Sequence, residues 1–144
     1  MFRAVTERSR WKALLDGDVE IPVNDHLGFR IEESPDPKEK IVLSWTVPPE
    51  YCNSTGNVQG GMLATFADSL LGGAASAYLP DDHFPALAEM KISIFRPAPG
   101  GSKLRGEGYI VKSGKRVLFA EAEIKDSEGR LIARASATEI PAEA

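Results

Sequence analysis

One long apolar segment limits what this chain can fold into. The polar, glycine-bearing loop Asn53 to Gly61 (NSTGNVQGG) is followed by the apolar run Met62 to Leu79, whose one charged residue is Asp68. Such a run predicts a helix that is apolar on nearly every side, and a helix of this kind needs covering on all sides. The rest of the sequence therefore has to supply a sheet that can wrap around it.

The same run has the length of a membrane span, but its charge argues against one. Asp68 near its middle would cost roughly 2.5–3.5 kcal/mol in a bilayer, and the run lacks flanking basic residues. We interpret it as the buried helix of a soluble protein without membrane contact. The chain begins without an apolar segment of signal-peptide length, and Cys52 is its single cysteine. A reducing, cytoplasmic location is therefore expected.

Length and charge limit the classes of function. The 144 residues predict one domain over residues 1–144, with an N-terminal helical extension over residues 1–21. The net charge of -4 and the absence of a Lys/Arg cluster argue against nucleic acid as a partner. His26 and His83 stand without a second ligand at metal-binding spacing, so neither a metal nor a cofactor is expected.

Alternating apolar and polar residues between Gly and Pro breaks predict six strands. The expected strands are His26 to Glu33, Lys40 to Val47, Leu87 to Arg96, Leu104 to Lys112, Arg116 to Lys125 and Arg130 to Ile140. A further helix is expected over Thr6 to Leu15. The last three strands are separated by short glycine-bearing links, which favour antiparallel hairpins. One long helix against an antiparallel sheet is an α+β architecture.

Asp68 and the glycine pair at the helix start are the main chemical candidates. A carboxylate in apolar surroundings is hydrogen-bonded or has a raised pKa, so Asp68 is either a structural residue or a functional acid. The backbone N–H groups of Gly60 and Gly61 have no intrahelical acceptor and lie at the positive end of the helix dipole. They either stabilise a carbonyl oxygen that becomes negative, as an oxyanion hole does, or belong to a tight turn.

The separation of these groups predicts a site shared between two chains. Asp68 follows Gly60 by eight residues, which corresponds to about 12 Å along a helix. One small reacting group cannot touch both, so two groups that act on the same carbonyl must come from different copies of the chain. The catalytic hypothesis therefore predicts a homodimer with two equivalent sites.

Polar residues outside the helix are further candidates. Asn53 can orient a water or a substrate carbonyl, or can serve as a turn former. Gln59 can hydrogen-bond the same loop. Lys115 and Arg116 follow a Ser-Gly turn, where they either bind a phosphate or are solvated charges.

The motif Asn53-x-x-Gly56-x-x-Gln59-Gly60-Gly61, with Asp68 in the following helix, resembles that of the hotdog-fold acyl-CoA thioesterases. It is most similar to the PaaI-like and 4-hydroxybenzoyl-CoA thioesterase superfamily, whose members usually read Asn-x-x-Gly-x-x-His-Gly-Gly. Phe95-Arg96-Pro97-Ala98 also resembles the family's strand that ends in Arg-Pro-Ala. The resemblance covers about Leu27 to Thr138. It implies a hotdog fold, in which an antiparallel sheet wraps around one long central helix.

The resemblance also implies roles for the residues at matching positions. Asp68 is expected to be the general base or the nucleophile. The Gly60 N–H of the partner subunit is expected to polarise the thioester carbonyl, and Asn53 of that same subunit is expected to position substrate or water. CoA is expected along the dimer surface near the later strands, which makes Lys115 and Arg116 candidates for binding it.

Further residues complete the predicted site. We expect an acyl tunnel lined by Met62, Phe66 and the N-terminal segment, which is interpreted as a cap over the substrate pocket. The predicted substrate-binding residues are Gln59, Gly61, Met62, Phe66 and Leu87, and the predicted CoA-binding residues are Lys115, Arg116 and Arg96.

Two positions depart from the family pattern and leave an alternative open. Gln59 replaces the usual His and cannot carry a proton, and Leu87 stands where many relatives have a Thr or Ser that can hold the attacking water. We therefore expect an acyl-CoA thioesterase that releases free acid and CoA, as a homodimer or a dimer of dimers. The alternative is a non-catalytic hotdog protein that binds acyl-CoA or lipid. A hotdog hydratase or dehydratase needs an Asp/His pair, and neither histidine has the expected spacing.

Overall fold

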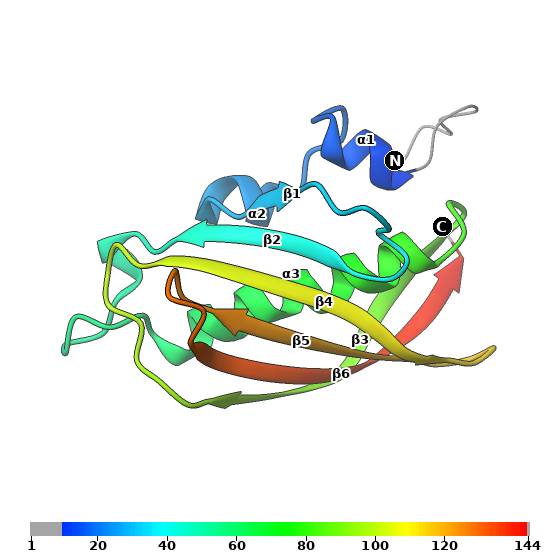
Figure 1. The fold of residues 1–144 in the computed structure, drawn as a ribbon. Coiled ribbons are helices and arrows are strands. Elements are labelled where there is room, and N and C mark those ends of the chain that lie inside the picture. The colour runs from blue at the N-terminus through cyan, green and yellow to red at the C-terminus, as the bar shows by residue number, and fades with distance from the viewer. Residues whose placement is uncertain (1–9, 144) are drawn as a thin grey trace.

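A computed structural model describes residues 10–143, and one long helix lies at its centre. This helix, α3, spans Gly60–Tyr78 and packs against a six-stranded antiparallel sheet (Figure 1). The predicted helix is confirmed, and it begins at the glycine pair. The arrangement is the sheet around a central helix that the hotdog fold requires. No helix between residues 10 and 143 is long and apolar enough to span a membrane.

The sheet has the strand order β1-β2-β4-β5-β6-β3, and all its neighbours are antiparallel. The strands are β1 (Arg30–Glu32), β2 (Ile41–Thr46), β3 (His83–Ile94), β4 (Lys103–Ser113), β5 (Leu118–Lys125) and β6 (Leu131–Glu143). A short 3-10 helix, Pro49–Tyr51, follows β2. The strands β1 and β3 lie at the two edges, so one side of each has no strand partner among the described residues.

The two predicted hairpins are present. Residues 114–117 connect β4 to β5, and residues 126–130 connect β5 to β6. In the second link, Asp126 Oδ1 accepts hydrogen bonds from the N–H groups of Glu128 at 3.0 Å and Arg130 at 2.9 Å. Gly129 has a φ of 79°, in the left-handed region that glycine adopts without strain. The links predicted from composition therefore close by ordinary turn chemistry.

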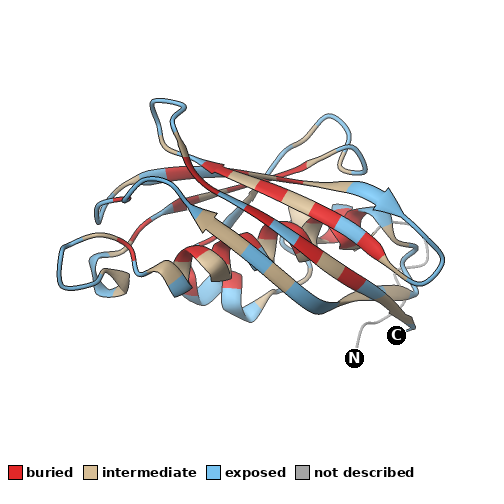
Figure 2. Ribbon diagram, turned by 90° about the horizontal axis from the view of Figure 1, so that it is seen from below, coloured by how far each residue is buried: buried red, intermediate tan, exposed pale blue. Residues whose placement is uncertain are grey.

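The core lies between α3 and the inner face of the sheet (Figure 2). Its centre is an aromatic cluster in which the Phe66 ring lies 4.9 Å from Phe29 and 5.6 Å from Trp45, measured between centroids. The covering of α3 is incomplete, because Gly61 and Asp68 remain exposed in the single chain. The sequence predicts that α3 is covered on all sides, but one of its faces is open in the single chain.

The N-terminal part departs from the sequence prediction. Helix α1 (Arg10–Leu15) agrees with the predicted helix, whose residues 6–9 lie outside the described part. The strand predicted over His26 to Glu33 is wrong in its first half, since Pro22–Leu27 forms helix α2 and strand begins only at β1. Proline suits the first turn of α2, and Gly28, with a φ of 84°, caps its end.

Hydrogen bonds hold both N-terminal helices against the rest of the fold. The Arg10 guanidinium donates to the carbonyl oxygens of Ser76, at 3.2 Å, and His83. Ser69 Oγ donates to Asn24 Oδ1 at 3.0 Å, and the Asn24 side chain is buried. The helical segment that covers α3 thus extends through α2, beyond residue 21.

Two glycines of β4 let α3 approach the sheet closely. A Cβ added at Gly106 would overlap the end of the Leu70 side chain, whereas one added at Gly108 would overlap the Leu70 backbone carbonyl. Leu70 is fully buried. The end of a side chain can rotate, but a helix backbone can move only if the helix unpacks. The absence of a side chain at Gly108 therefore allows the close approach of α3 to β4.

We expect Gly108→Ala to lower the free energy of unfolding by about 3 kcal/mol, because the added methyl group pushes α3 off the sheet. Gly106→Ala should cost less, because Leu70 can change rotamer. The control is Gly72→Ala in α3, where an added Cβ meets nothing within 4 Å and better helix propensity favours a gain of about 1 kcal/mol. Urea denaturation measures all three. Equal stabilities of the Gly108 and Gly72 variants would contradict the packing argument.

Candidate functional site

The loop before α3 holds Asn53 by its side-chain oxygen. Asn53 Oδ1 accepts hydrogen bonds from the Thr55 N–H at 3.0 Å, the Thr55 hydroxyl at 2.6 Å and the Asn57 N–H at 3.3 Å. Gly56, with a φ of 78°, lets the chain reverse inside this loop. Asn53 is therefore a turn former. Its exposed side chain has no acceptor for Nδ2 among the described residues, so Nδ2 is free to donate to a ligand.

The start of α3 offers backbone donors. Gln59 is the N-cap residue, and its carbonyl accepts hydrogen bonds from Met62 at 2.8 Å and Leu63 at 3.2 Å. The Gln59 side chain is exposed and makes no capping hydrogen bond. The N–H groups of Gly60 and Gly61 lie in the first turn, where a helix provides no acceptor. Two donors at the positive end of the helix dipole are thus available to an oxygen atom.

A cavity of about 400 Å³ brings Asn53, Gly60 and Arg96 together. Ile94, at the end of β3, also lines it, and a Cβ on Gly60 would lie 3.3 Å from Ile94 Cδ1. The absence of a side chain at Gly60 therefore leaves space in the cavity next to Ile94. Two predicted catalytic groups and one predicted CoA-binding residue share the cavity, whereas Asp68 does not line it.

Asp68 lies on the open face of α3. Gly61, Thr65, Asp68 and Gly72 follow one another at spacings of four, three and four residues, so they lie on one side of the helix. Asp68 is exposed in the single chain, yet partial burial of its carboxyl group raises the pKa of Asp68 above the usual value. A carboxylate with a raised pKa accepts a proton more readily near neutral pH.

Glu139 is a second carboxyl group, on which the charge of Asp68 acts, and the sequence motifs do not include it. Glu139 is 1% exposed, and its Oε1 has no hydrogen-bond partner within residues 10–143. Burial, and to a smaller extent the charge of Asp68, raises the pKa of Glu139 to about 7. Two carboxyl groups that interact electrostatically do not ionise independently. The structure thus adds Glu139 as a further candidate for a group that holds a proton.

The burial pattern of β6 explains how Glu139 could have been found. Ala133, Ala135 and Ala137 are buried, whereas Ser136 is exposed. Glu139 continues the buried phase of this alternation. An acid at a position that faces the core departs from the local pattern, and such departures are expected mainly at functional sites.

Leu87 lies directly opposite Glu139 in the ladder between β3 and β6, so both side chains are on the same face of the sheet. Leu87 is 43% exposed, and the register shifts between Leu87 and Glu89, where β3 bulges. Figure 2 shows why the exposure is high, since the edge strand β3 has no buried residue along its length. The structure therefore brings Leu87 next to Glu139 and not to the Gly60 cavity.

A second cavity, of about 250 Å³, lies between α3 and the N-terminal helices. Gly72 and Ser76 line it from α3 and follow Asp68 by four and eight residues, so the cavity continues the Asp68 face of the helix. Trp11 and Ile21 line it from the N-terminal segment. The N-terminal helices thus cover a hollow on the Asp68 side of α3.

Two predicted substrate contacts lie elsewhere. Phe66 is fully buried in the aromatic cluster, and Met62 packs against the core. Neither lines a cavity described for residues 10–143. Their assignment to an acyl tunnel stays a prediction, and for Phe66 the structure indicates a core role.

The predicted CoA-binding residues are divided between two places. Lys115 and Arg116 lie exposed in the turn between β4 and β5, at the opposite end of the sheet from the loop that precedes α3 (Figure 1). Arg96 lies at the Gly60 cavity. A single chain therefore does not bring these three cations together.

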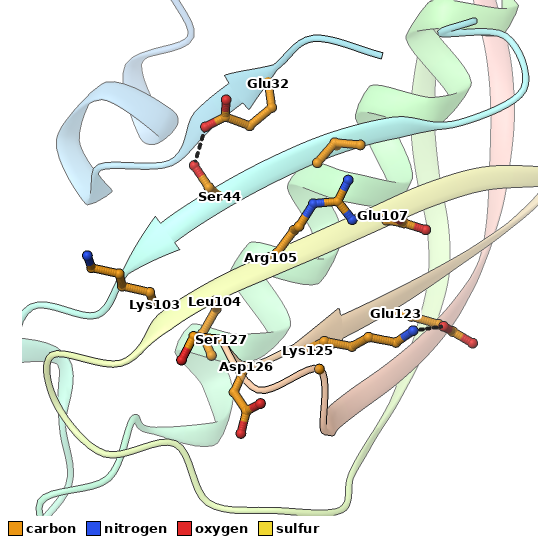
Figure 3. A pocket seen from close by; sticks show the side chains of 12 residues that line it. Glu32, Ser44, Lys103, Leu104, Arg105, Glu107, Glu123, Lys125, Asp126 and Ser127 are labelled. Carbon is orange, nitrogen blue, oxygen red and sulfur yellow. Dashed lines mark hydrogen bonds and ion pairs between the residues drawn. The ribbon is translucent and has the colours of Figure 1, made fainter. Parts of the chain in front are cut away.

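The largest of the described cavities, about 570 Å³, lies on the outer face of the sheet (Figure 3). Acidic and basic side chains line it side by side. Arg105 pairs with Glu107, and Lys125 Nζ lies 3.7 Å from Glu123 Oε2. Because these charges neutralise one another, the hollow does not select for an anionic ligand. No group of three His, Cys, Asp or Glu side chains that could bind a metal occurs within residues 10–143.

Comparison with known proteins gives a consistent result. The sequence profile of the thioesterase superfamily matches residues 55–133. Acyl-coenzyme A thioesterase 13 of Mus musculus is 28% identical over 98 residues, which cover 67% of this chain and 69% of that protein. A Caenorhabditis elegans protein is 28% identical over 102 residues, 70% of this chain, and the match spans 60% of that longer protein.

Solved structures show the same architecture. A phenylacetic acid degradation-related protein from Ralstonia eutropha superposes with a TM-score of 0.83 at 27% identity, covering 90% of this chain and 98% of that one. The PaaI protein of E. coli, from the phenylacetic acid degradation operon, superposes with a TM-score of 0.81 at 18% identity, covering 92% of both chains. At 18% identity the second likeness concerns the fold alone.

Proposed function

The chain belongs to the thioesterase superfamily, and from this premise we propose that it is an acyl-CoA thioesterase, which hydrolyses acyl-CoA to the free acid and CoA. The observation that carries the proposal is the pair of half-sites on α3. Gly60 offers a free N–H donor at the start of the helix, and Asp68 offers a carboxyl group with a raised pKa on its open face. These are the two groups that thioester hydrolysis needs, a stabiliser for the carbonyl oxygen and an acceptor for a proton of water.

The proposed reaction has Asp68 as general base. Asp68 takes one proton from a water molecule as the water oxygen bonds to the thioester carbonyl carbon. The carbonyl oxygen becomes an oxyanion and accepts a hydrogen bond from the Gly60 N–H, with Asn53 Nδ2 as a second donor. When the intermediate collapses, the C–S bond breaks and the thiolate of CoA takes the proton from Asp68. A direct attack by Asp68 on the carbonyl carbon, with an anhydride intermediate, is the alternative route.

We infer that two chains complete each site. About 12 Å of helix separates Gly60 from Asp68, and the two groups do not share a cavity within one chain. The edge strand β3 has one side without a strand partner within residues 10–143, and it exposes Phe84, Leu87 and Ile94. An apolar edge strand of this kind is a template for pairing with another strand. Antiparallel pairing of two β3 strands would extend the sheet across a homodimer and cover the open faces of both α3 helices.

CoA binding follows from the same arrangement. Arg96 lines the cavity that also holds Gly60 and Asn53, and this supports a role for its guanidinium in binding the CoA portion of a thioester presented to Gly60. Lys115 and Arg116 are exposed at the other end of the sheet, and a second chain is needed to bring them near that cavity. Guanidinium and ammonium groups are suited to phosphates.

The acyl group is assigned to the cavity beneath the N-terminal helices. That cavity continues the Asp68 face of α3, and its lining is largely apolar, with Trp11, Ile21 and Gly72 among its members. The alternative function, acyl-CoA binding without hydrolysis, is motivated by Gln59 and Leu87, because neither supplies the proton-carrying or hydroxyl group usual at these positions.

We expect Asp68→Asn and Asp68→Ala to lower kcat for acyl-CoA hydrolysis by about 100-fold or more, the usual contribution of a general base. Release of free thiol from short, aryl and medium-chain acyl-CoA esters measures this. The exposed Glu128→Gln, in the turn between β5 and β6, is the matched control and should behave as wild type. Unchanged activity in both Asp68 variants would refute the assignment. Binding of CoA esters without thiol release would favour the alternative function.

The shared site predicts complementation between two inactive variants. In a mixed dimer of an Asp68→Ala chain and an Asn53→Ala chain, one site has Asp68 from one subunit and Asn53 from the other, so that site is intact. We expect the mixed dimer, isolated by two different tags, to recover about half of the wild-type activity, since one of two equivalent sites is restored. Activity no higher than the mean of the two parent homodimers, or a stable monomer in sedimentation, would contradict a site shared between chains.

The acyl cavity predicts a change in substrate preference. Gly72→Leu places a branched side chain in a hollow where an added Cβ meets nothing within 4 Å, so the fold should tolerate it. We expect kcat/KM to fall by about tenfold or more for medium-chain esters and to change little for acetyl-CoA. Gly72→Ala is the control for the loss of glycine. An equal effect on short and medium chains would argue against this location of the acyl group.

A further inference from the structure

Glu139 has no part in the reaction described above, yet its position is costly. A carboxyl group that is 1% exposed and has an oxygen without a hydrogen-bond partner within residues 10–143 costs stability unless it stays protonated or finds a partner. It occupies one of the core-facing positions of β6, where an apolar side chain would be expected. A buried carboxyl group at this position suggests that its proton has a function.

Asp68 is the one charged group among the described residues whose charge is seen to act on Glu139. The ladder partners of Glu139 are Leu87 on β3 and Leu118 on β5, both apolar. From α3, the charge of Asp68 acts on it. The charged residues of the neighbouring strands that lie nearest are paired with outward-facing positions of β6, Glu89 with Thr138, Lys91 and Glu121 with Ser136, and Glu123 with Arg134, whereas Lys125 lies at the far end of the strand opposite Leu131. The group that a protonated Glu139 can address is therefore the Asp68 carboxylate.

We propose that Glu139 is a positioning residue for the proposed thioesterase reaction, in which its protonated carboxyl group donates a hydrogen bond to Asp68 and orients that carboxylate toward the attacking water. The proposal rests on the proposed function of Asp68. A hydrogen bond from a carboxylic acid to a carboxylate is charge-assisted and strong. Asp68 needs such a partner, because its own side chain has no hydrogen bond among the described residues that would fix its orientation.

This arrangement depends on pH in a definite direction. Asp68, the more exposed of the two, ionises first, while burial keeps the proton on Glu139, whose pKa is raised to about 7. Below that pH Glu139 donates its hydrogen bond. Above it, Glu139 loses the proton, and two negative charges face each other. Activity should therefore fall on the alkaline side of a bell-shaped profile, with both limbs belonging to the coupled pair.

The test compares Glu139→Gln and Glu139→Leu in the full-length protein. The Gln amide is a neutral donor at every pH, so we expect wild-type-like kcat at low pH and loss of the alkaline limb of kcat. Leucine matches the apolar neighbours and removes the donor, so we expect kcat to fall by about tenfold or more, the value of a hydrogen bond to a charged group, with KM little changed. Rescue by Gln but not by Leu is the signature of positioning.

Two results would overturn the proposal. One is an alkaline limb that is the same in wild type and Glu139→Gln. The other is full activity in Glu139→Leu. A residue with only a structural role would alter the unfolding temperature of these variants but would not move the pH profile.

A second measurement keeps this test separate from the test of the proposed function. Infrared difference spectra on the full chain detect the stretch of a protonated carboxyl group without any substrate. We expect a band that disappears as the pH rises through about 7 and that is absent in Glu139→Gln. Without this band, the proposal fails even if the wild type hydrolyses acyl-CoA. With the band but without thiol release, it is the thioesterase assignment that fails, and the proposed role of Glu139 fails with it.

Discussion

The contact between Leu70 and the two glycines of β4 decides how α3 lies in this fold. Because Gly106 and Gly108 have no side chains, the helix rests directly on the sheet with Leu70 buried. An α-helix turns by about 100° per residue, so Asp68, two positions earlier, points to nearly the opposite side of the helix. That side is the open face of the helix, where Asp68 is exposed in the single chain. The packing of one leucine thus sets the direction of the carboxyl group on which the proposed chemistry depends.

The same rotation leaves the helix open on its Asp68 side, and this links the fold to the proposed assembly. The curved sheet of one chain contacts α3 from β2 around to β3, and the edge strand β3 exposes the apolar side chains Phe84, Leu87 and Ile94. Helix α3 contacts the edge strand β3, so a single second copy that pairs with β3 could also cover the open helix face. Formation of one dimer would then complete both half-sites of α3. This explains why Gly60 and Asp68 can lie far apart on the same helix and still act on one substrate.

The extent to which the sequence predicts this structure depends on the range of the interactions. The helix α3 and the β4–β5–β6 hairpins were predicted because each rests on a local signal, an apolar run or a glycine-bearing link. Helix α2 was missed because Pro22 to Leu27 is too short for its pattern to separate helix from strand, and its end depends on Gly28 in the left-handed region. A local sequence pattern cannot predict which residues share a cavity. Asn53 and Arg96 are far apart in the sequence, and only the fold brings them to the same cavity.

Glu139 bears on the interpretation of Gln59, the position of the motif that departs from the family's usual His. Gln59 cannot carry a proton, so the loop before α3 supplies donors but no second titrating group. The structure places a second titrating group, Glu139, in β6, where burial favours its protonated form and the charge of Asp68 acts on it. Two carboxyl groups in different environments, one more exposed and one buried, are a known way for a protein to separate the ionised partner from the protonated one. In this chain, the proton absent at Gln59 would be supplied from the sheet beneath the helix.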